Sequence, residues 1–277
     1  MGAAALLLCG CLGGTPMRVA GGIYAALGDS YTAGPFIPNP TGNVGCWRSD
    51  HAYPALVAAA LHVTALHNAS CGAATIGDLS AVQQVVPVAN PPQLDILTAN
   101  TNLVTLGIGA NDMQFIALAA TCLDPAATTQ PCTSKWVAGS TDKISGYIGQ
   151  ARQRLLGALR KIRARAPHAA VFVVGYPAVV PDRGSTCAGD NLPAANVPYV
   201  RAKVKQLDAM LAAAARSSGD RYIDEYTPSI GHDLCQPPGA RWIEPIDPTP
   251  PVAEFHPNAA GMAGMARVVV RAVQAAS

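Results

Sequence analysis

Residues 23–34 read Ile-Tyr-Ala-Ala-Leu-Gly-Asp-Ser-Tyr-Thr-Ala-Gly, an apolar run that is followed by small and polar residues. The apolar run Ile23–Leu27 predicts a buried strand that stops at Gly28, Asp29 and Ser30. A serine at a strand-to-helix turn can present its hydroxyl at the edge of an α/β sheet, a geometry that suits a nucleophile. The alternative is that Asp29 or Ser30 only caps the following helix.

Strand-like and helix-like segments alternate along the chain. Strands are predicted over residues 23–27, 63–69, 103–108, 170–174 and 222–223, and helices over 53–62, 92–97, 144–162, 200–214 and 262–276. This alternation predicts the α/β class, as a three-layer α/β/α sandwich around a five-stranded parallel sheet. Residues 121–141, 177–198 and 229–251 show neither pattern and are expected to be irregular surface loops.

The predicted topology brings polar residues to one edge of the sheet. Ser30 follows the first strand, Cys71 and Gly72 follow the second, and Asn111 follows the third. Parallel α/β sheets bind their ligands at the carboxyl ends of the strands. The sequence therefore predicts a single site built from these loops.

Composition limits the class of protein. The chain has 277 residues, of which 50% are hydrophobic and 13% charged, so it can form a large core and is not disordered. A net charge of +2 gives no indication of a nucleic-acid partner. The basic residues of 152–165 have the spacing of the wet face of an amphipathic helix. We find no repeat or linker, and we expect one domain over residues 21–277 that is a monomer.

The first twenty residues differ from the rest. Ala3–Leu12 is an apolar segment that is too short to span a membrane and is typical of a secretory signal. Leu8-Cys9-Gly10-Cys11 also resembles a lipoprotein box, in which Cys11 would carry the lipid. We prefer simple secretion, and we predict residues 1–20 to be an export segment that leads to a secreted or cell-envelope protein.

Six cysteines lie beyond the export segment. An even number of cysteines in an exported chain predicts disulfides, although six cysteines allow 15 pairings and the spacing does not choose among them. Metal binding is the alternative, but no two of them have CxxC spacing. The sequence also lacks a phosphate-binding loop and a dinucleotide fingerprint, so we predict neither a metal nor a cofactor.

Four short motifs occur in one order along the chain. They are Gly28-Asp29-Ser30, Gly72, Gly109-Ala110-Asn111-Asp112 and His256-Pro257-Asn258. Together with Tyr31 and the six cysteines, they resemble the SGNH (GDSL) hydrolases, in particular the secreted actinobacterial esterases and lipases. The resemblance covers nearly all of the chain after residue 20 and implies the flavodoxin-like SGNH hydrolase fold. Together with this resemblance we predict the disulfides Cys46–Cys71, Cys122–Cys132 and Cys187–Cys235.

The resemblance also implies the role of each motif residue. Ser30 is the nucleophile, and His256, with an ordinary pKa near ~6.5, is the general base. The backbone N–H groups of Ser30 and Gly72 and the side-chain amide of Asn111 form the oxyanion hole. The alternative for the last two motifs is that they are a turn and a helix start only.

One position departs from the family pattern. The family usually places an aspartate three residues before the histidine, but this chain has Ala253 there. We expect a backbone carbonyl near Ala253 to accept the Nδ1–H bond of His256, which would fix the tautomer of the ring. The Glu254 carboxylate, two residues before the histidine, is the second candidate.

The motif residues together predict an ester hydrolase. We predict a secreted serine esterase or lipase that hydrolyses small-molecule or lipid esters through an acyl-enzyme on Ser30, with transient contact with a cell envelope or lipid interface. A polysaccharide deacetylase or an acyltransferase is the nearer alternative. A non-catalytic surface binding protein on the same scaffold is a more distant one, and the missing aspartate is its best argument.

Overall fold

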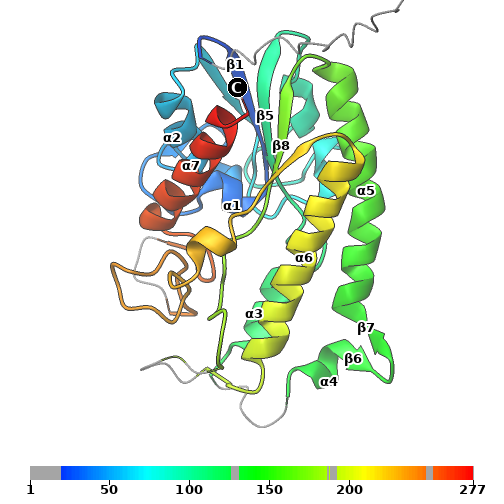
Figure 1. The fold of residues 1–277 in the computed structure, drawn as a ribbon, viewed down its shortest axis with the longest axis vertical. Helices are drawn as coiled ribbons and strands as arrows, with labels where there is room; N and C mark the ends of the chain where they lie inside the picture. The colour runs from blue at the N-terminus through cyan, green and yellow to red at the C-terminus, as the bar shows by residue number, and fades with distance from the viewer. Residues whose placement is uncertain (1–19, 126–130, 186, 188–191, 248–251, 277) are drawn as a thin grey trace, which may run out of the picture.

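A five-stranded parallel sheet runs through the middle of the molecule (Figure 1). The computed structural model describes residues 20–125, 131–185, 187, 192–247 and 252–276. The sheet has the strand order β4-β1-β5-β8-β9, with the strands β1 (Ile23–Gly28), β4 (Ala65–Asn68), β5 (Thr101–Gly107), β8 (Ala170–Val174) and β9 (Arg221–Ile223). Every adjacent pair is parallel, which confirms the predicted α/β class and the five-stranded sheet.

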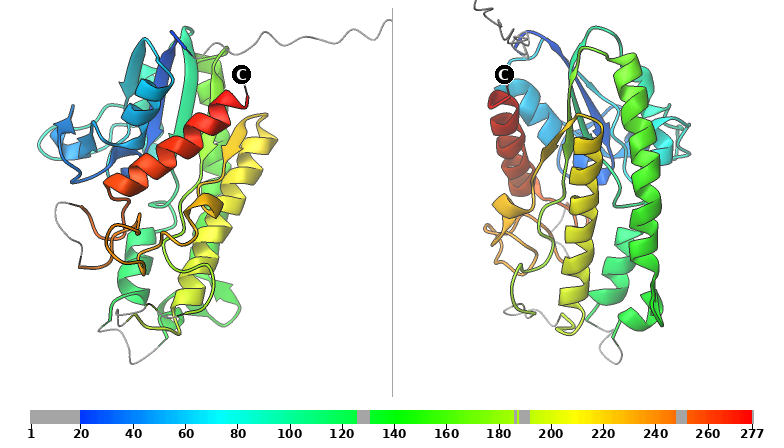
Figure 2. Two further views of the ribbon diagram at one scale, coloured as in Figure 1. Left: turned by 60° about the vertical axis from the view of Figure 1, so that its left-hand side comes forward. Right: turned by 45° about the vertical axis from the view of Figure 1, so that its right-hand side comes forward.

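Long helices cover both faces of this sheet. α2 (Tyr53–Ala60) and α7 (Ala259–Gln274) lie on one face, and α5 (Lys143–Arg165) and α6 (Val197–Ser217) lie on the other (Figure 2). Two separate hydrophobic clusters fill the two interfaces, because successive side chains of a strand point to opposite faces. The predicted three-layer sandwich is therefore confirmed.

Helix α5 shows how the sequence specifies these elements. It begins where the Asp142 side chain accepts a hydrogen bond from the Ser145 N–H, 3.0 Å away. Its apolar residues at helical spacing, including Ile148 and Leu155, are buried, while Arg154 and Lys161 are exposed. The basic residues thus form the solvent face, as predicted.

Short elements connect the long ones, and the sequence did not predict most of them. The predicted irregular stretch 121–141 contains a short helix and a hairpin, because elements of two to four residues leave no periodic pattern. The helix α3 (Phe115–Cys122) was also missed, because apart from Thr121 it consists of apolar residues. These remaining elements are α1 (Ser30–Ala33), β2 (Pro40–Thr41), η1 (Val44–Cys46), β3 (Arg48–Ser49), η2 (Ile76–Leu79), η3 (Gln93–Ile96), α3 (Phe115–Cys122), α4 (Thr133–Trp136), β6 (Val137–Ala138), β7 (Thr141–Asp142) and η4 (Thr227–Ser229).

Three disulfides fasten the loops. The structure pairs Cys46 with Cys71, Cys122 with Cys132 and Cys187 with Cys235, the pairs given above. The predicted export segment and its Cys11 lie outside the described residues, apart from residue 20. Within the described part of the chain, no helix has both the length and the hydropathy of a membrane span.

Candidate active site

Ser30 and His256 meet at the carboxyl edge of the sheet. Ser30 is the first residue of α1, directly after β1, and His256 lies in the loop that precedes α7. The Oγ of Ser30 is 2.7 Å from the Nε2 of His256, although the residues are 226 positions apart in sequence. Their exposed fractions are 8% and 7%, so the pair lies just below the surface. Nothing in the sequence spacing fixes this contact, which depends on the fold.

The turn after β1 holds Ser30 in position. Gly28 has a φ of +155°, and a Cβ there would lie 2.4 Å from the Gly107 carbonyl oxygen, so only glycine fits. The Gln93 side chain accepts from the Gly28 N–H at 2.8 Å and donates to the Gly28 carbonyl at 2.9 Å. Asp29 caps α1 by accepting from the Tyr31 N–H at 2.9 Å. The capping role of Asp29 and the presentation of the Ser30 hydroxyl therefore coexist.

A backbone carbonyl orients His256, but it is not the one predicted. The Nδ1 of His256 is 2.7 Å from the carbonyl oxygen of Glu254. The Ala253 carbonyl instead accepts from the backbone N–H of His256 at 3.3 Å. The Glu254 side chain is exposed, and no hydrogen bond joins its carboxylate to the ring within the described residues.

The conformation of Phe255 explains this correction. Its φ of +59° turns the chain, and its N–H donates to the Glu244 carbonyl at 2.9 Å. Because the N–H and C=O of one trans peptide point in opposite directions, the Glu254 carbonyl faces the imidazole. The Tyr31 hydroxyl donates to the Phe255 carbonyl at 2.5 Å and fixes the turn to α1. Tyr31 is thus a positioning residue for the histidine loop.

The motif His256-Pro257-Asn258 also begins a helix, which was the alternative interpretation of this motif. The Asn258 side chain accepts from the Gly261 N–H at 2.9 Å and caps α7. Its amide nitrogen donates to Glu244 Oε1 at 2.8 Å, which links the cap to the neighbouring loop. The helix start and the histidine loop are therefore one structural unit.

The electrostatic surroundings keep His256 neutral. Burial lowers the pKa of its imidazole below the ordinary 6.5, and the hydrogen bond to the Glu254 carbonyl opposes this shift only in part. At neutral pH the ring therefore has a free lone pair on Nε2, facing the Ser30 hydroxyl. This is the protonation state that a general base requires.

This lowered pKa predicts the acid side of the pH profile. We expect kcat/KM for a soluble ester to persist as the pH falls through 6.5 and to decline only below it, where His256 becomes protonated. Asp29 precedes Ser30 and could imitate this effect, because burial raises the pKa of its carboxyl to about 7 against the hydrogen bond from Tyr176. The decline must therefore remain below pH 6.5 in Asp29→Asn, and a decline centred at or above 6.5 in that variant would contradict the assignment to His256.

A buried hydrogen-bond network joins the ends of β1, β5 and β8. The Tyr176 hydroxyl donates to Asp29 Oδ2 at 2.5 Å and accepts from the Ala110 N–H at 3.0 Å. It therefore fixes the loop that carries Ser30 relative to the loop that carries Asn111. Sequence reasoning missed Tyr176, although its place just after β8 is a signal that could have identified it.

The structure places Gly72 differently from the prediction. Its N–H donates to the Cys46 carbonyl at 3.0 Å. The prediction that the same N–H donates to an oxyanion is therefore wrong for the conformation in this structure. Its carbonyl accepts from Gln83 Nε2 at 2.8 Å. Glycine is required for another reason, since a Cβ here would lie 2.8 Å from the Trp47 ring.

The N–H of Ala73 differs from that of Gly72. Ala73 has a φ of +60°, which is uncommon for a residue with a side chain, and it is exposed. The carbonyl of the Gly72–Ala73 peptide points to Gln83, so the Ala73 N–H points the opposite way. No acceptor for this N–H occurs among the described residues. The sequence does not indicate this N–H, because alanine is not a residue type that favours a positive φ.

Asn111 lies next to this turn. Its Nδ2 donates one hydrogen to the Ala74 carbonyl at 2.9 Å, which leaves the second amide hydrogen for another acceptor. The neighbouring Asp112 has a structural role: it accepts from the Ile76 N–H at 2.9 Å and pairs with Arg154 at 3.1 Å. The Asn111 amide and the Ala73 N–H therefore belong to two loops that are joined by a direct hydrogen bond.

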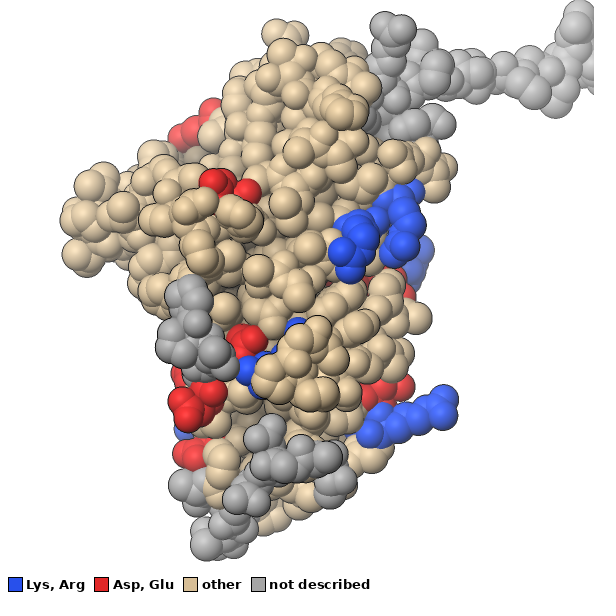
Figure 3. All heavy atoms as spheres, turned by 90° about the vertical axis from the view of Figure 1, so that its left-hand side faces the viewer, with Lys and Arg blue, Asp and Glu red and all other residues tan. Residues whose placement is uncertain are grey.

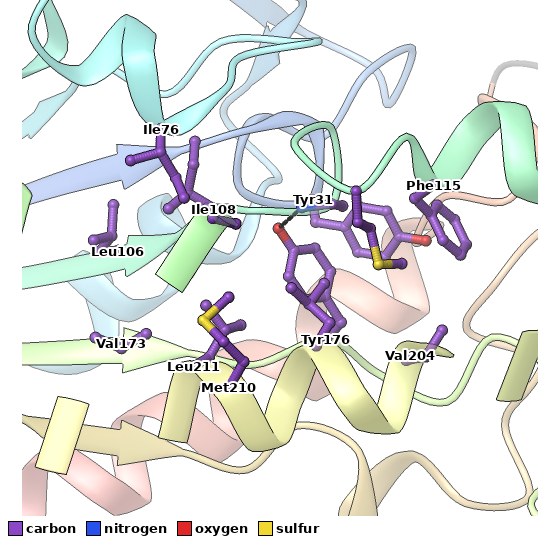
Figure 4. Packing of buried hydrophobic residues seen from close by; sticks show 14 of the residues in the cluster. Tyr31, Ile76, Leu106, Ile108, Phe115, Val173, Tyr176, Val204, Met210 and Leu211 are labelled. Carbon is purple, nitrogen blue, oxygen red and sulfur yellow. Dashed lines mark hydrogen bonds between the residues drawn. The ribbon is translucent and has the colours of Figure 1, made fainter. Parts of the chain in front are cut away.

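Packing beside Ser30 is apolar and dense. The Tyr31 ring makes edge-to-face contacts with the rings of Phe115 and Tyr176, with Val204 of α6 nearby (Figure 4). The cavity between them has a volume of only about 10 Å³, roughly the space of one water, so it is not a formed acyl pocket. Within the described residues, no cluster of three or more His, Cys, Asp or Glu side chains could hold a metal ion.

Known proteins share this sequence and this fold. The sequence profile of the GDSL-like Lipase/Acylhydrolase family matches residues 26–263. "Lipase 2" of Streptomyces coelicolor is 37% identical over 252 residues, which cover 88% of this chain and 83% of that protein. "Lipase" of Streptomyces rimosus is 32% identical over 241 residues, which cover 86% and 81% of the two chains.

Two solved structures are similar over their entire length. Phospholipase A1 from Streptomyces albidoflavus NA297 superposes with a TM-score of 0.76 at 27% identity and covers 93% of this chain and 100% of its own. The extracellular lipase from Streptomyces rimosus superposes with a TM-score of 0.75 at 29% identity and covers 92% and 100%. The chain belongs to the GDSL-like lipase/acylhydrolase family.

Proposed function

We propose that this protein is a secreted serine esterase or lipase that hydrolyses carboxylic esters through an acyl-enzyme on Ser30. The observation that carries the proposal is the 2.7 Å contact between Ser30 Oγ and His256 Nε2, made by an imidazole whose pKa is lowered by burial. A binding protein on this scaffold has no need for such a pair. The relatives named lipase and the neighbour named phospholipase A1 support ester substrates.

The reaction follows from the geometry in two halves. Ser30 Oγ attacks the ester carbonyl carbon while His256 Nε2 takes the hydroxyl proton, and the carbonyl oxygen becomes an oxyanion. The carbon–oxygen bond to the alcohol then breaks, and the alcohol leaves with the proton from His256. Water then attacks the acyl carbon while His256 takes its proton, the bond from that carbon to Ser30 Oγ breaks, and His256 returns the proton to Ser30 Oγ as the acid is released.

Three donors are proposed for the oxyanion. They are the backbone N–H groups of Ser30 and Ala73 and the second amide hydrogen of Asn111. Each such donor typically stabilises the transition state by about 2.7–4 kcal/mol. The Glu254 carbonyl holds the His256 ring through Nδ1, and its dipole takes the place of the charge of an aspartate.

The role of Ala73 can be tested by removing a single hydrogen-bond donor. Lactic acid incorporated in place of Ala73 replaces the N–H with an ester oxygen and keeps the methyl side chain. We expect kcat to fall about 10²–10³-fold, with little change in Tm, because no protein group accepts this N–H in the described structure.

Glycolic acid in place of Gly72 is the matched control. It removes the hydrogen bond to the Cys46 carbonyl, so we expect a lower Tm and a smaller change in kcat. If the Gly72 substitution lowers kcat and the Ala73 substitution does not, the donor is Gly72 after all.

A comparison of substrates tests the proposed activity. We expect turnover of p-nitrophenyl esters with acyl chains longer than acetate, and no release of acetate from an acetylated glycan. An optimum at acetate combined with turnover of the glycan would instead assign the protein as a polysaccharide deacetylase. No turnover of any ester by correctly oxidised protein would contradict the proposal.

We also propose that the protein is exported. The support is the three disulfides of the folded chain, since such bonds persist in oxidising compartments. The export segment at residues 1–20 and the single domain over 21–277 are part of this proposal.

A further inference from the structure

Five large apolar side chains are exposed together on two adjacent loops. We call them the outer patch, and they comprise Phe36, Val44, Trp47, Val86 and Val88. Their exposed fractions run from 45% for Trp47 to 88% for Val86. Scattered exposed apolar residues are ordinary, but a contiguous group on a monomer usually marks an interaction site.

Specific contacts hold the two loops of the outer patch together. The Asn43 amide donates to the Val88 carbonyl at 2.7 Å, and the rings of Phe36 and Trp47 lie 5.4 Å apart. Phe36 and Trp47 have φ values of +60° and +53°, which bulky residues rarely adopt. The two aromatic residues therefore keep an uncommon backbone conformation while about half of each side chain stays exposed.

The outer patch is continuous with the candidate active site. Trp47 follows Cys46, whose disulfide to Cys71 and whose carbonyl contact with Gly72 both anchor the turn at Gly72 and Ala73. The Trp47 ring lies so close to Gly72 that a Cβ there would clash with it. A surface that covers the patch therefore also approaches the residues on which the ester would bind.

Neither loop carries a charge. Residues 31–47 and residues 79–94 contain no Asp, Glu, Lys or Arg. The loops around residues 35–47 project beyond α2 at the edge of the molecule (Figure 2, left), and charged side chains are sparse over the upper part of the face shown in Figure 3. A surface of this kind offers no ion pair to a protein partner and no attraction to an anionic membrane.

We propose that the outer patch docks the enzyme on the surface of a neutral lipid aggregate that contains its ester substrate. Valine and phenylalanine side chains enter the acyl region, while tryptophan is the residue type that favours the boundary between acyl chains and headgroups. The proposal rests on the proposed function, because it explains how a water-insoluble ester reaches Ser30. It excludes a requirement for anionic lipid, since the patch has no basic residue.

The test separates binding from catalysis. Binding is measured with Ser30→Ala protein by flotation with vesicles of pure dioleoyl phosphatidylcholine, so that no substrate turnover is needed. The same protein with Val86→Glu and Val88→Glu is compared with a control that carries Gln153→Glu and Ala164→Glu on the exposed face of α5. We expect the patch variant to lose binding at least about tenfold, and the control to bind like Ser30→Ala alone.

Activity is measured on the same changes with Ser30 intact. We expect kcat/KM for soluble p-nitrophenyl butyrate to be unchanged, and hydrolysis of p-nitrophenyl decanoate dissolved in the vesicles to fall by at least about tenfold. Failure to hydrolyse the soluble ester would count against the proposed function alone, because vesicle binding is scored independently.

Two outcomes would overturn the docking proposal. One is vesicle binding that survives in the patch variant. The other is a protein that does not bind neutral vesicles and forms a dimer in light scattering that the patch variant lacks, since a second copy of the chain would then be the occupant.

Discussion

Replacing Ser30 with alanine is expected to lower kcat for a soluble ester by about 10⁴–10⁶-fold. The substitution removes the attacking oxygen, so only binding and the oxyanion donors remain to assist direct attack by water. The folded state should persist, because the change deletes one hydroxyl whose only side-chain partner in the described structure is His256 Nε2. Steady-state hydrolysis of p-nitrophenyl butyrate and the Tm of the same sample measure both effects.

The control for this substitution is Ser49→Ala. Ser49 is also buried, and its hydroxyl also makes a hydrogen bond, donating to the Pro38 carbonyl at 2.8 Å. We expect this variant to keep kcat close to that of the unaltered protein. Retention of more than about 1% of kcat in Ser30→Ala would show that another group performs the attack.

Replacing His256 with alanine is expected to cause a loss of similar size, about 10⁴–10⁶-fold in kcat, because residues that act as a catalytic unit are not additive. Ser30 would keep its hydroxyl but lose the group that takes its proton. Added imidazole should restore part of the rate, since the substitution leaves room for a small base beside Ser30. Kinetics over a series of imidazole concentrations measure this rescue.

Glu254→Gln is the matched control, and it separates the two candidates for orienting His256. The Glu254 carbonyl accepts from the ring, whereas its carboxylate is exposed, so the substitution preserves the observed contact. We expect kcat to change by less than about threefold. A loss near 10⁴-fold, the size seen when an orienting carboxylate is removed, would assign the role to the side chain instead.

The sequence was sufficient to predict the elements with a clear periodic pattern. Helix α5 and strand β8 fall where the pattern of apolar residues places them, because both pack a defined face against the core. The elements that were missed show no contrast of apolar and polar residues. The helix α3 buries one face, but its exposed residues Ile116, Ala117 and Ala120 are apolar too, and the hairpin of β6 and β7 is too short to show alternation.

The residues of the candidate site also fall into those that the sequence predicted and those that it did not. Ser30, His256 and Asn111 lie in recognisable motifs, and the fold brings the first two into contact. The proposed donor at Ala73 could not be predicted, because the choice between two successive N–H groups depends on which one the Cys46 carbonyl occupies. The orienting carbonyl was missed by one residue for a similar reason, since the positive φ of Phe255 decides which peptide faces the ring.

Labelling with a fluorophosphonate measures whether Ser30 is an activated nucleophile. This reagent phosphonylates a serine only when a neighbouring base activates its hydroxyl, and peptide mass spectrometry identifies the modified residue. We expect a single stoichiometric adduct on Ser30, lost in Ser30→Ala and strongly slowed in His256→Ala. An unlabelled protein that is correctly folded with its three disulfides, or an adduct on another residue, would contradict it.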